Sequence, residues 1–329
     1  MPELQLYQGH STAKKEQADP LGIETYLPSD SLIKAVQLAQ ILRRPLLVKG
    51  EPGCGKSRLA EAVAAELFGL RFREYYFEWN IKSSSKAQDG LYLINNLQRL
   101  SDANFKTEDR QSLSISLFKD KQGRYHPHGK YIDLGVLGQA FLLSQNNTLP
   151  APPVVLIDEI DKADIDFPND LLLELDRMEF EIPEIIEDGA PLRIKANLRP
   201  LFIITSNDEK PLPPAFLRRC LFHYIEFRDI RLTEIVRSKF PLLAATPPII
   251  DDAIKAFTEW RKKIAEKGTS SKNITTGELL DWVRLIDYYV ARGEKPVLNP
   301  NALPEYHQAL LKDPESIKIF ASNEAATAP

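Results

Sequence analysis

The sequence predicts an α/β fold with a largely parallel sheet, followed by a smaller helical region. Short apolar runs at residues 46–48, 154–157 and 201–205 are typical of strands buried on both faces. Helical stretches separate these runs, which indicates parallel strands joined by right-handed crossovers. After Thr233 the strand patterns stop and apolar residues recur at helical spacing. The 329 residues suffice for two domains of about 150 residues each.

The N-terminal part opens with residues 1–20, which show little periodicity and predict a flexible arm. Ser29 and Asp30 can cap the first helix, and Pro45 ends it. Its apolar residues at helical spacing are Leu32, Val36, Ala39 and Leu42. The strand at 46–48 then enters a glycine-rich turn that leads into a second helix.

That second helix carries one apolar face and is closed by Gly69. The face consists of Leu59, Val63, Ala64 and Leu67. An aromatic strand is predicted at 73–79. The polar region from Ser83 to Gly129 is consistent with an insertion that holds a hairpin. His126 and His128 within it lack a third ligand nearby, so no metal site is predicted.

The C-terminal part predicts two amphipathic helices. The first carries an apolar stripe of Ile250, Ile254, Phe257, Trp260 and Ile264. The second begins at Thr275, where Thr275 and Glu278 fit a capping box, and runs to Gly293. The expected organisation is an arm over 1–20, an α/β domain over 21–228, a helical domain over 229–320 and a frayed tail over 321–329.

The composition restricts the partners and the compartment. A net charge of −4 and a pI near 5.9 disfavour indiscriminate nucleic-acid binding, so a protein partner is expected. Only Cys54 and Cys220 occur, too few for a disulfide framework. No apolar run approaches the roughly 20 residues of a membrane span, and the N-terminus lacks a signal-peptide core. A cytoplasmic protein is expected.

The strongest motif is the glycine-rich turn, which satisfies G-x-x-x-x-G-K-[ST] between an apolar strand and a helix. Its backbone N–H groups and the following helix N-terminus would bind the phosphates of ATP. Lys56 would reach the β- and γ-phosphates, and the Ser57 hydroxyl would ligate Mg²⁺. A glycine turn that contains lysine by chance is disfavoured, because the pattern and both flanks agree. The predicted nucleotide-binding residues are Gly50, Glu51, Pro52, Gly53, Cys54, Gly55, Lys56, Ser57 and Arg58.

Two further strands end in polar residues. Asp158 and Glu159 follow the run at 154–157, where Asp158 would hold Mg²⁺ and Glu159 would polarise the attacking water. A polar strand end is the alternative, but the phosphate loop upstream favours the functional interpretation. Asn207 follows the run at 201–205 and would position water without adding negative charge. Its alternative is a turn-forming asparagine.

A short helix opened by Pro213 and Pro214 ends in Arg218 and Arg219. Adjacent arginines there are usually a solvated helix end that complements the dipole. Because they follow Asn207 closely, they are also candidates for an arginine finger that stabilises transition-state charge in a neighbouring subunit.

In this order, the glycine-rich loop, Asp158-Glu159-Ile160-Asp161-Lys162-Ala163, Thr205-Ser206-Asn207 and Leu212-Pro213-Pro214-Ala215-Phe216-Leu217-Arg218-Arg219-Cys220 resemble the MoxR-like AAA+ ATPases. The resemblance covers roughly residues 20 to 295. It implies a RecA-like P-loop ATPase domain, a small all-α lid, an insertion within the second helix, and a hairpin at 180–196 that turns at Asp188-Gly189.

The resemblance also implies function. Such proteins form homo-oligomeric, typically hexameric, rings and remodel protein complexes, often with partners that contain von Willebrand factor A domains. By position, Asn207 matches sensor 1 and Arg219 matches the finger. The family usually has an aspartate where Arg218 stands, which leaves open which arginine acts. Where the family often has the sensor 2 arginine, this sequence has Thr276-Gly277-Glu278. Arg284, two helical turns further along, is a candidate to replace that arginine.

Three functions therefore compete. The first is an ATP-hydrolysing machine that remodels proteins in a chaperone-like manner. The second is a binding module that uses ATP as a switch with little turnover, and the third is a nucleic-acid motor or restriction-type ATPase. Glu159, Asn207 and the arginine pair favour turnover, and the acidic charge balance disfavours the nucleic-acid motor.

Overall fold

The computed structural model describes residues 5–10, 12, 15–95, 97, 116–119, 125–128, 131–145, 149–187, 189–227, 229–244, 247–267, 273–299 and 302–324. The chain divides into two compact units. Unit 1 comprises Met1–Thr12, Pro28–Lys49 and Lys56–Tyr224, and unit 2 comprises Ala13–Leu27, Gly50–Gly55 and Ile225–Pro329. The six residues Gly50–Gly55 therefore belong to the same compact unit as the C-terminal helices.

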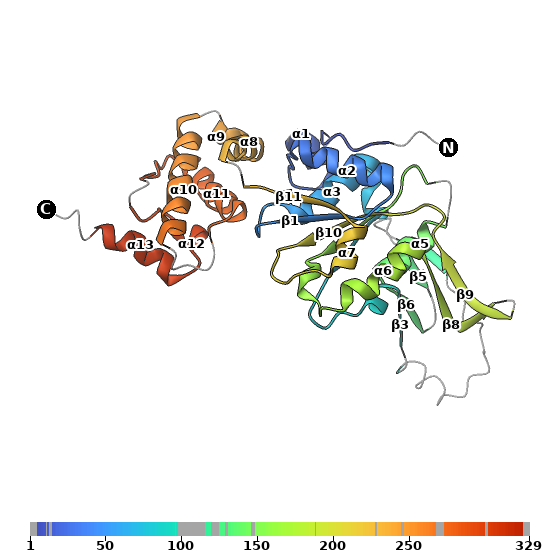
Figure 1. Cartoon of the computed structure of the whole chain (residues 1–329). Helices are drawn as coiled ribbons and strands as arrows, with labels where there is room; N and C mark the ends of the chain where they lie inside the picture. The colour runs from blue at the N-terminus through green and yellow to red at the C-terminus, as the bar shows by residue number, and fades with distance from the viewer. Residues whose placement is uncertain are drawn as a thin grey trace. The chain divides into compact units, whose positions relative to one another are not determined.

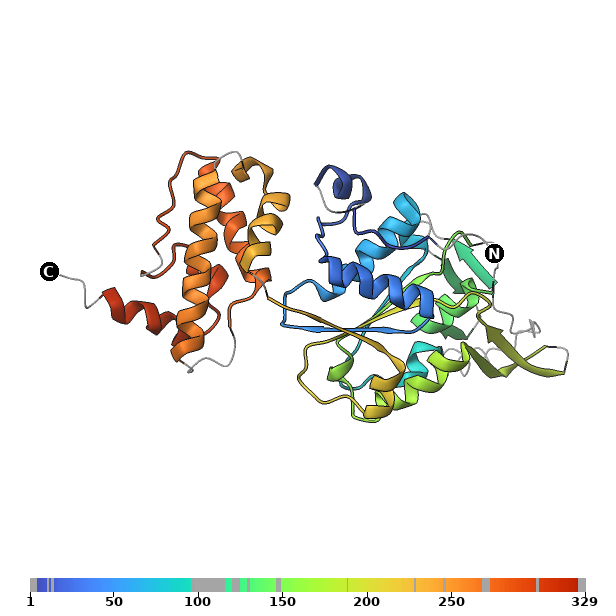
Figure 2. The same ribbon diagram turned by 45° about the horizontal axis from the view of Figure 1, so that its top comes forward.

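A five-stranded sheet forms the centre of the α/β part (Figures 1 and 2). Its strands lie in the order β11-β1-β10-β7-β2, and the β1–β10, β10–β7 and β7–β2 pairs are parallel. This confirms the predicted α/β class and the parallel sheet. The strands are β1 (Leu46–Gly50), β2 (Tyr76–Asn80), β7 (Val154–Asp158), β10 (Leu201–Ser206) and β11 (Leu221–Ile225).

Helices cover both faces of this sheet, as its uninterrupted apolar strands require. The helices α2 (Asp30–Leu42) and α3 (Lys56–Phe68) lie on one face, and α5 (Val136–Leu143) and α6 (Phe167–Arg177) lie on the other (Figures 1 and 2). Alternate strand residues point to the α5 and α6 face and join one buried cluster. They are Leu47, Val155, Ile157, Phe202 and Ile204.

The helix signals were largely correct. The Ser29 side chain caps α2 by accepting a hydrogen bond from the Leu32 N–H at 3.2 Å. Gly69 closes α3 with a φ of 57°, a conformation that favours glycine. The predicted apolar face of α2 is too long by one turn, because Leu42 is 52% exposed.

The aromatic strand predicted at 73–79 begins later than expected, at Tyr76. Before it, Gly69–Glu74 forms the 3-10 helix η2, in which the Arg71 guanidinium donates to both Glu74 carboxylate oxygens at 2.9 and 2.7 Å. Phe72 is buried within this turn. Local side-chain pairing and burial therefore prevail over the β propensity of the aromatic residues.

The arm predicted over residues 1–20 makes specific contacts in its described part. The Tyr7 N–H donates to Gln40 Oε1 on α2 at 3.0 Å, and the His10 N–H donates to Glu66 Oε2 on α3 at 3.0 Å. Tyr7 is 1% exposed. The short helices α1 (Lys15–Ala18) and η1 (Asp19–Leu21) follow in unit 2.

Three antiparallel strand pairs accompany the sheet. β3 (Tyr92–Ile94) pairs with β6 (Ile132–Leu134), and β4 (Ser116–Lys119) pairs with β5 (Tyr125–His128). The second pair confirms a hairpin within the region from Ser83 to Gly129. β8 (Glu179–Glu187) and β9 (Ala190–Lys195) form the hairpin that the resemblance implies, with Gly189 at a φ of 82°. Asp188 lies outside the described residues.

The remaining elements of the α/β part are short: η3 (Ala87–Gly90), η4 (Ile160–Lys162) and α7 (Pro214–Arg219). His126 and His128 lie on β5, and no group of potential metal ligands occurs among the described residues. Among those same residues, no helix combines the length and apolar character needed to span a membrane.

Beyond β11, the described chain of unit 2 is helical, as predicted. The helices are α8 (Asp229–Lys239), α9 (Pro241–Ala244), α10 (Pro247–Lys267), α11 (Thr276–Val290), α12 (His307–Leu310) and α13 (Pro314–Glu324). The predicted α10 stripe is buried, and Trp260 packs edge-on against Trp282 of α11 with ring centroids 5.2 Å apart. Thr275 and Glu278 form the predicted capping box. A frayed tail was expected from residue 321, but α13 continues to Glu324.

Candidate functional site

The glycine-rich segment joins β1 to α3, as its sequence context predicted. Gly53 and Gly55 have φ values of 72° and 89°, in the left-handed region that other residues rarely adopt. A Cβ atom on Gly53 would lie 2.8 Å from Thr275 Oγ1, so the segment has no room for a side chain there. Lys56 opens α3 and is only 6% exposed. Helix N-termini of this kind favour phosphate binding through backbone N–H groups and the helix dipole.

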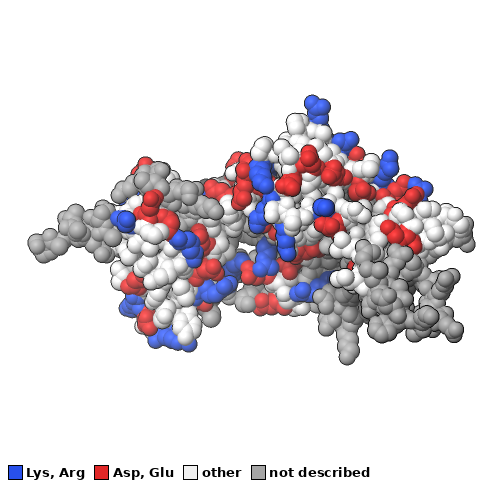
Figure 3. Space-filling view, turned by 90° about the horizontal axis from the view of Figure 1, so that it is seen from below, with Lys and Arg blue, Asp and Glu red and all other residues white. Residues whose placement is uncertain are grey.

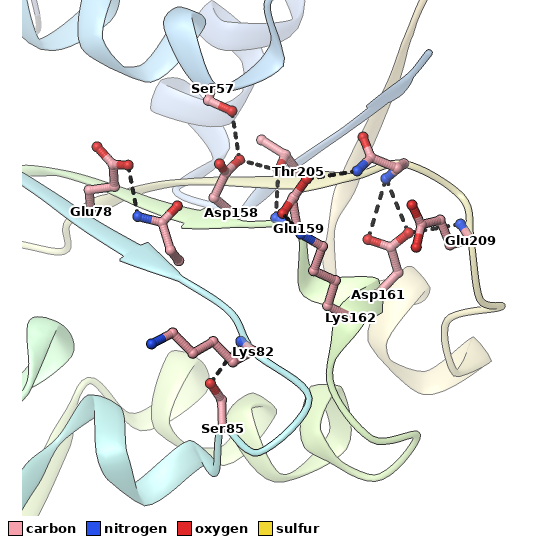
Figure 4. A network of polar contacts seen from close by, with 12 residues as sticks. Ser57, Glu78, Lys82, Ser85, Asp158, Glu159, Asp161, Lys162, Thr205 and Glu209 are labelled. Atoms are coloured by element: carbon pink, nitrogen blue, oxygen red, sulfur yellow. Dashed lines mark hydrogen bonds and ion pairs between the residues drawn. The ribbon is translucent and has the colours of Figure 1, made fainter. Parts of the chain in front are cut away.

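Asp158 lies at the centre of a hydrogen-bond network at the carboxyl end of the sheet (Figure 4). Its Oδ1 accepts hydrogen bonds from Ser57 Oγ at 2.7 Å and from Thr205 Oγ1 at 2.6 Å. The Thr205 hydroxyl oxygen in turn accepts from the Glu159 N–H at 2.8 Å. Three elements, α3, β7 and β10, therefore converge on one carboxylate. The network brings together the predicted Mg²⁺ ligands Ser57 and Asp158.

Glu159 leaves the strand in a left-handed conformation, with φ 58° and ψ 51°. This turn directs its carboxylate to Lys162, whose ammonium pairs with Oε2 (Figure 4). The Asn207 Nδ2 donates to Oε1 of the same carboxylate at 2.9 Å. A non-glycine residue in this region usually costs about 1 kcal/mol or more and persists where surrounding contacts hold it. The Asn207 and Lys162 contacts provide such support.

These contacts make the Glu159 carboxylate a weaker base than an ordinary glutamate. Burial raises its pKa, but the hydrogen bonds from Lys162 and Asn207 and the charges of Lys162 and Lys56 outweigh burial and lower the pKa below its ordinary value. The hydrogen bond from Lys162 to Glu159 correspondingly raises the pKa of Lys162. Glu159 is therefore a carboxylate at neutral pH.

Asp161 fixes the loop that carries Asn207, a role that the sequence had not revealed. Its carboxylate accepts the backbone N–H of Asn207 at 3.1 Å and that of Glu209 at 2.8 Å, and the side chain is buried. Asp208 between them adopts a left-handed φ of 63°. Asn207 is thus held by its backbone as well as by its side chain, and the acidic run after β7 was the signal that could have suggested this.

The structure does not bring the arginine pair to this network. Both residues lie exposed at the end of α7, and Arg219 Nε forms an ion pair with Asp176 Oδ2 at 2.8 Å. Arg44 donates to the backbone carbonyls of Arg218, Arg219 and Cys220, which ties the end of α7 to the end of α2. Within the described chain, neither arginine contacts Asp158 or Glu159.

The other predicted residues have ordinary surroundings. Arg58 is half exposed and pairs with Glu61 on its own helix at 2.8 Å. Arg284, considered as a sensor 2 substitute, is 62% exposed and pairs with Asp281 at 3.4 Å. Burial raises the pKa of the Cys220 thiol to about 12, so it is neutral. Cys54 is partly buried and forms no disulfide.

The side chains present suit a magnesium nucleotide. Ser57 and Asp158 offer adjacent hard oxygen donors, and Mg²⁺ typically binds through one or two such protein groups together with phosphate oxygens and water. The glycine backbone and the start of α3 offer N–H donors for phosphate. Lys56 supplies a cation at the same helix start.

Comparison with known proteins agrees with this geometry. Residues 46–228, more than half of the chain, match the family model described as the ATPase family associated with various cellular activities (AAA). The chain belongs to the AAA ATPase family. As a member of this family it is an ATPase, and its nucleotide is ATP.

Two further comparisons accompany this match. The structure of NtrX from Brucella abortus in complex with ATP is similar at 18% identity and a TM-score of 0.39, over 86% of the present AAA ATPase and 54% of NtrX. The chain thus spans about half the length of that protein. None of the curated proteins compared with the AAA ATPase matches it in sequence.

Proposed function

We propose that this AAA ATPase is a MoxR-like ring ATPase that hydrolyses Mg²⁺·ATP and uses the energy to remodel or assemble protein complexes in a chaperone-like manner. The observation that carries the proposal is the convergence of Ser57, Asp158, Glu159, Thr205 and Asn207 on one edge of the sheet. The β8–β9 hairpin before the β10 strand supports the MoxR-like assignment.

The proposed roles follow from this arrangement. Lys56 and the backbone of the glycine segment bind the phosphates, while Ser57 and Asp158 hold Mg²⁺, which would supply electrostatic stabilisation of the transferring phosphoryl group. Glu159 accepts the proton of the attacking water, and Asn207 keeps that carboxylate in position. A module that only bound ATP would not need the Glu159 and Asn207 pair, so ATP hydrolysis is favoured over a purely switching role.

The finger belongs to a neighbouring subunit in this proposal, since no described contact joins the arginines to their own site. Arg219 and Asp176 are 48% and 47% exposed, and exposed ion pairs contribute only about 0–1 kcal/mol. Breaking the ion pair with Asp176, so that Arg219 can reach a neighbouring subunit, therefore costs little free energy. Arg218 has no described side-chain partner and is the alternative finger. A homo-oligomeric, hexameric ring follows if the contact is heterologous and closes.

Proteins are the proposed clients, with von Willebrand factor A domain proteins as candidate partners. Figure 3 shows acidic side chains next to basic ones on the visible face. The net charge of −4 disfavours binding along a phosphate backbone. The cytoplasm is the proposed compartment, because neither cysteine forms a disulfide. The α/β domain is proposed to end at residue 228 and the helical lid to span 229–320.

Mixing two inactive variants tests the ring and the finger together. Arg219→Ala and Glu159→Gln should each bind ATP and hydrolyse it poorly. In rings made from equal amounts of both, about a quarter of the sites should combine an intact Glu159 with an intact neighbouring Arg219, if subunits exchange randomly. Hydrolysis should then recover. A mixture that stays inactive despite demonstrated exchange would exclude Arg219, and Arg218→Ala mixed in the same way is the matched comparison.

A further inference from the structure

The phosphate-binding segment is joined to the helical region by an ion pair that its sequence does not reveal. Within unit 2, Arg261 Nη2 of α10 lies 2.8 Å from Glu51 Oε1 and 2.6 Å from Glu51 Oε2. The side chain of Arg261 is 11% exposed and that of Glu51 is 38% exposed. Pairs as buried as this one are screened by solvent far less than surface pairs.

Two further contacts hold the Arg261 guanidinium in place. Its Nη1 donates to the Ile274 carbonyl, just before α11, and its Cζ lies 3.8 Å from the ring centroid of Phe227. The start of α11 itself touches the segment, because Thr275 Oγ1 occupies the space that a Cβ on Gly53 would need. The guanidinium is thus fixed on three sides, and its charge faces the glycine segment.

The charge of Glu51 explains why such a cation is needed. Glu51 is the second residue of the segment that would receive the triphosphate, so its carboxylate repels the nucleotide unless a cation compensates it. Arg261 is the cation that the structure places on that carboxylate. Arg284, by contrast, pairs with the neighbouring Asp281 on the surface of α11.

We propose that Arg261 is a positioning residue for nucleotide binding, which neutralises Glu51 and holds the phosphate-binding segment against the helical region. This inference rests on the proposed location of the ATP site in that segment. Nucleotide affinity then depends on the pair as a unit. Loss of Arg261 alone is harmful because it leaves the Glu51 charge uncompensated by this cation, whereas loss of both charges is tolerated.

Binding without turnover tests the pair. The dissociation constants of fluorescent ATP and ADP analogues are measured by titration for the parent, Arg261→Met, Glu51→Gln and the double variant, together with the melting temperature of each nucleotide-free protein. Arg261→Met should weaken ATP binding at least tenfold, and ADP binding less, because ADP carries one negative charge fewer. Glu51→Gln should weaken ATP binding less than Arg261→Met does, because it removes the carboxylate that repels the nucleotide and keeps the Arg261 charge. The double variant should bind ATP within threefold of the parent.

Several outcomes would overturn the inference. Unchanged ATP affinity in Arg261→Met would do so, as would a double variant that binds no better than Arg261→Met. If Arg261→Met fails to fold, the melting temperature decides: the double variant must restore folding, and failure to restore it refutes the pairing. Arg284→Met, an exposed arginine of α11, is the control and should bind like the parent.

Lys56→Ala separates this inference from the site on which it rests. If Lys56→Ala binds ATP normally, the proposed phosphate site is wrong. If it loses binding while Arg261→Met keeps it, the site stands and only the role of Arg261 falls.

Discussion

Replacing Asp161 by asparagine tests how the loop that carries Asn207 is held. The Asp161 carboxylate is 2% exposed and accepts two backbone N–H groups, those of Asn207 and Glu209. An asparagine has nearly the same shape, but only one of its two terminal atoms accepts a hydrogen bond. Both N–H groups donate to Oδ2, and the Asn207 N–H also reaches Oδ1 at 3.3 Å. With its oxygen in the place of Oδ2, an asparagine would keep both bonds to a neutral acceptor and would turn its NH₂ group toward the Asn207 N–H.

The magnitude follows from these two bonds. Hydrogen bonds to a charged group contribute about 1.5–3 kcal/mol each, against about 0.5–1.5 kcal/mol for a neutral one. Exchanging two charged bonds for two neutral bonds should lower the free energy of unfolding by about 2–3 kcal/mol. The Asn207 amide contacts Glu159 at 2.9 Å, so a loosened loop should also lower kcat about tenfold, or roughly 1.4 kcal/mol of transition-state stabilisation.

Urea unfolding followed by fluorescence measures the first effect, and steady-state phosphate release at saturating ATP measures the second. Asp164→Asn is the matched control, because Asp164 is an exposed aspartate three residues along the same loop. It should change stability by less than about 0.5 kcal/mol. If Asp161→Asn unfolds at the parent urea concentration and turns over at the parent rate, Asp161 does not hold the loop.

Two further predictions concern Glu159. Glu159→Gln should bind ATP with parental affinity and lose hydrolysis, since the amide fills the same space but does not accept a proton; parental turnover would require another base. Lys162→Met removes the hydrogen bond and the charge that lower the pKa of Glu159, so that pKa should rise and the acid limb of the kcat–pH profile should move to higher pH than in the parent. An acid limb that stays in place or moves to lower pH would contradict the assigned base.

The local patterns of the sequence were enough to predict the α/β class, the glycine-rich turn between β1 and α3 and the acidic residues at the end of β7. Each of these features depends on residues that are contiguous in the sequence: an apolar run buried on both faces, glycines that turn the backbone, and a polar residue at a strand end. The capping box at Thr275 was predictable for the same reason. Where a neighbouring side chain competes, as in the Arg71 and Glu74 pair, the start of a strand was misplaced.

Contacts between distant residues were decided only by the tertiary structure. Thr205 lies 47 residues from Asp158, and Arg261 lies 210 residues from Glu51, yet each pair is within hydrogen-bond distance. Asp161 is close in sequence to Glu159, but its backbone partners come from the loop after β10. The residues around a polar side chain in the sequence do not reveal its hydrogen-bond partner, because strand order and helix packing determine which distant residues come into contact. The sequence therefore determined which groups could serve the site, and folding determined which of them meet.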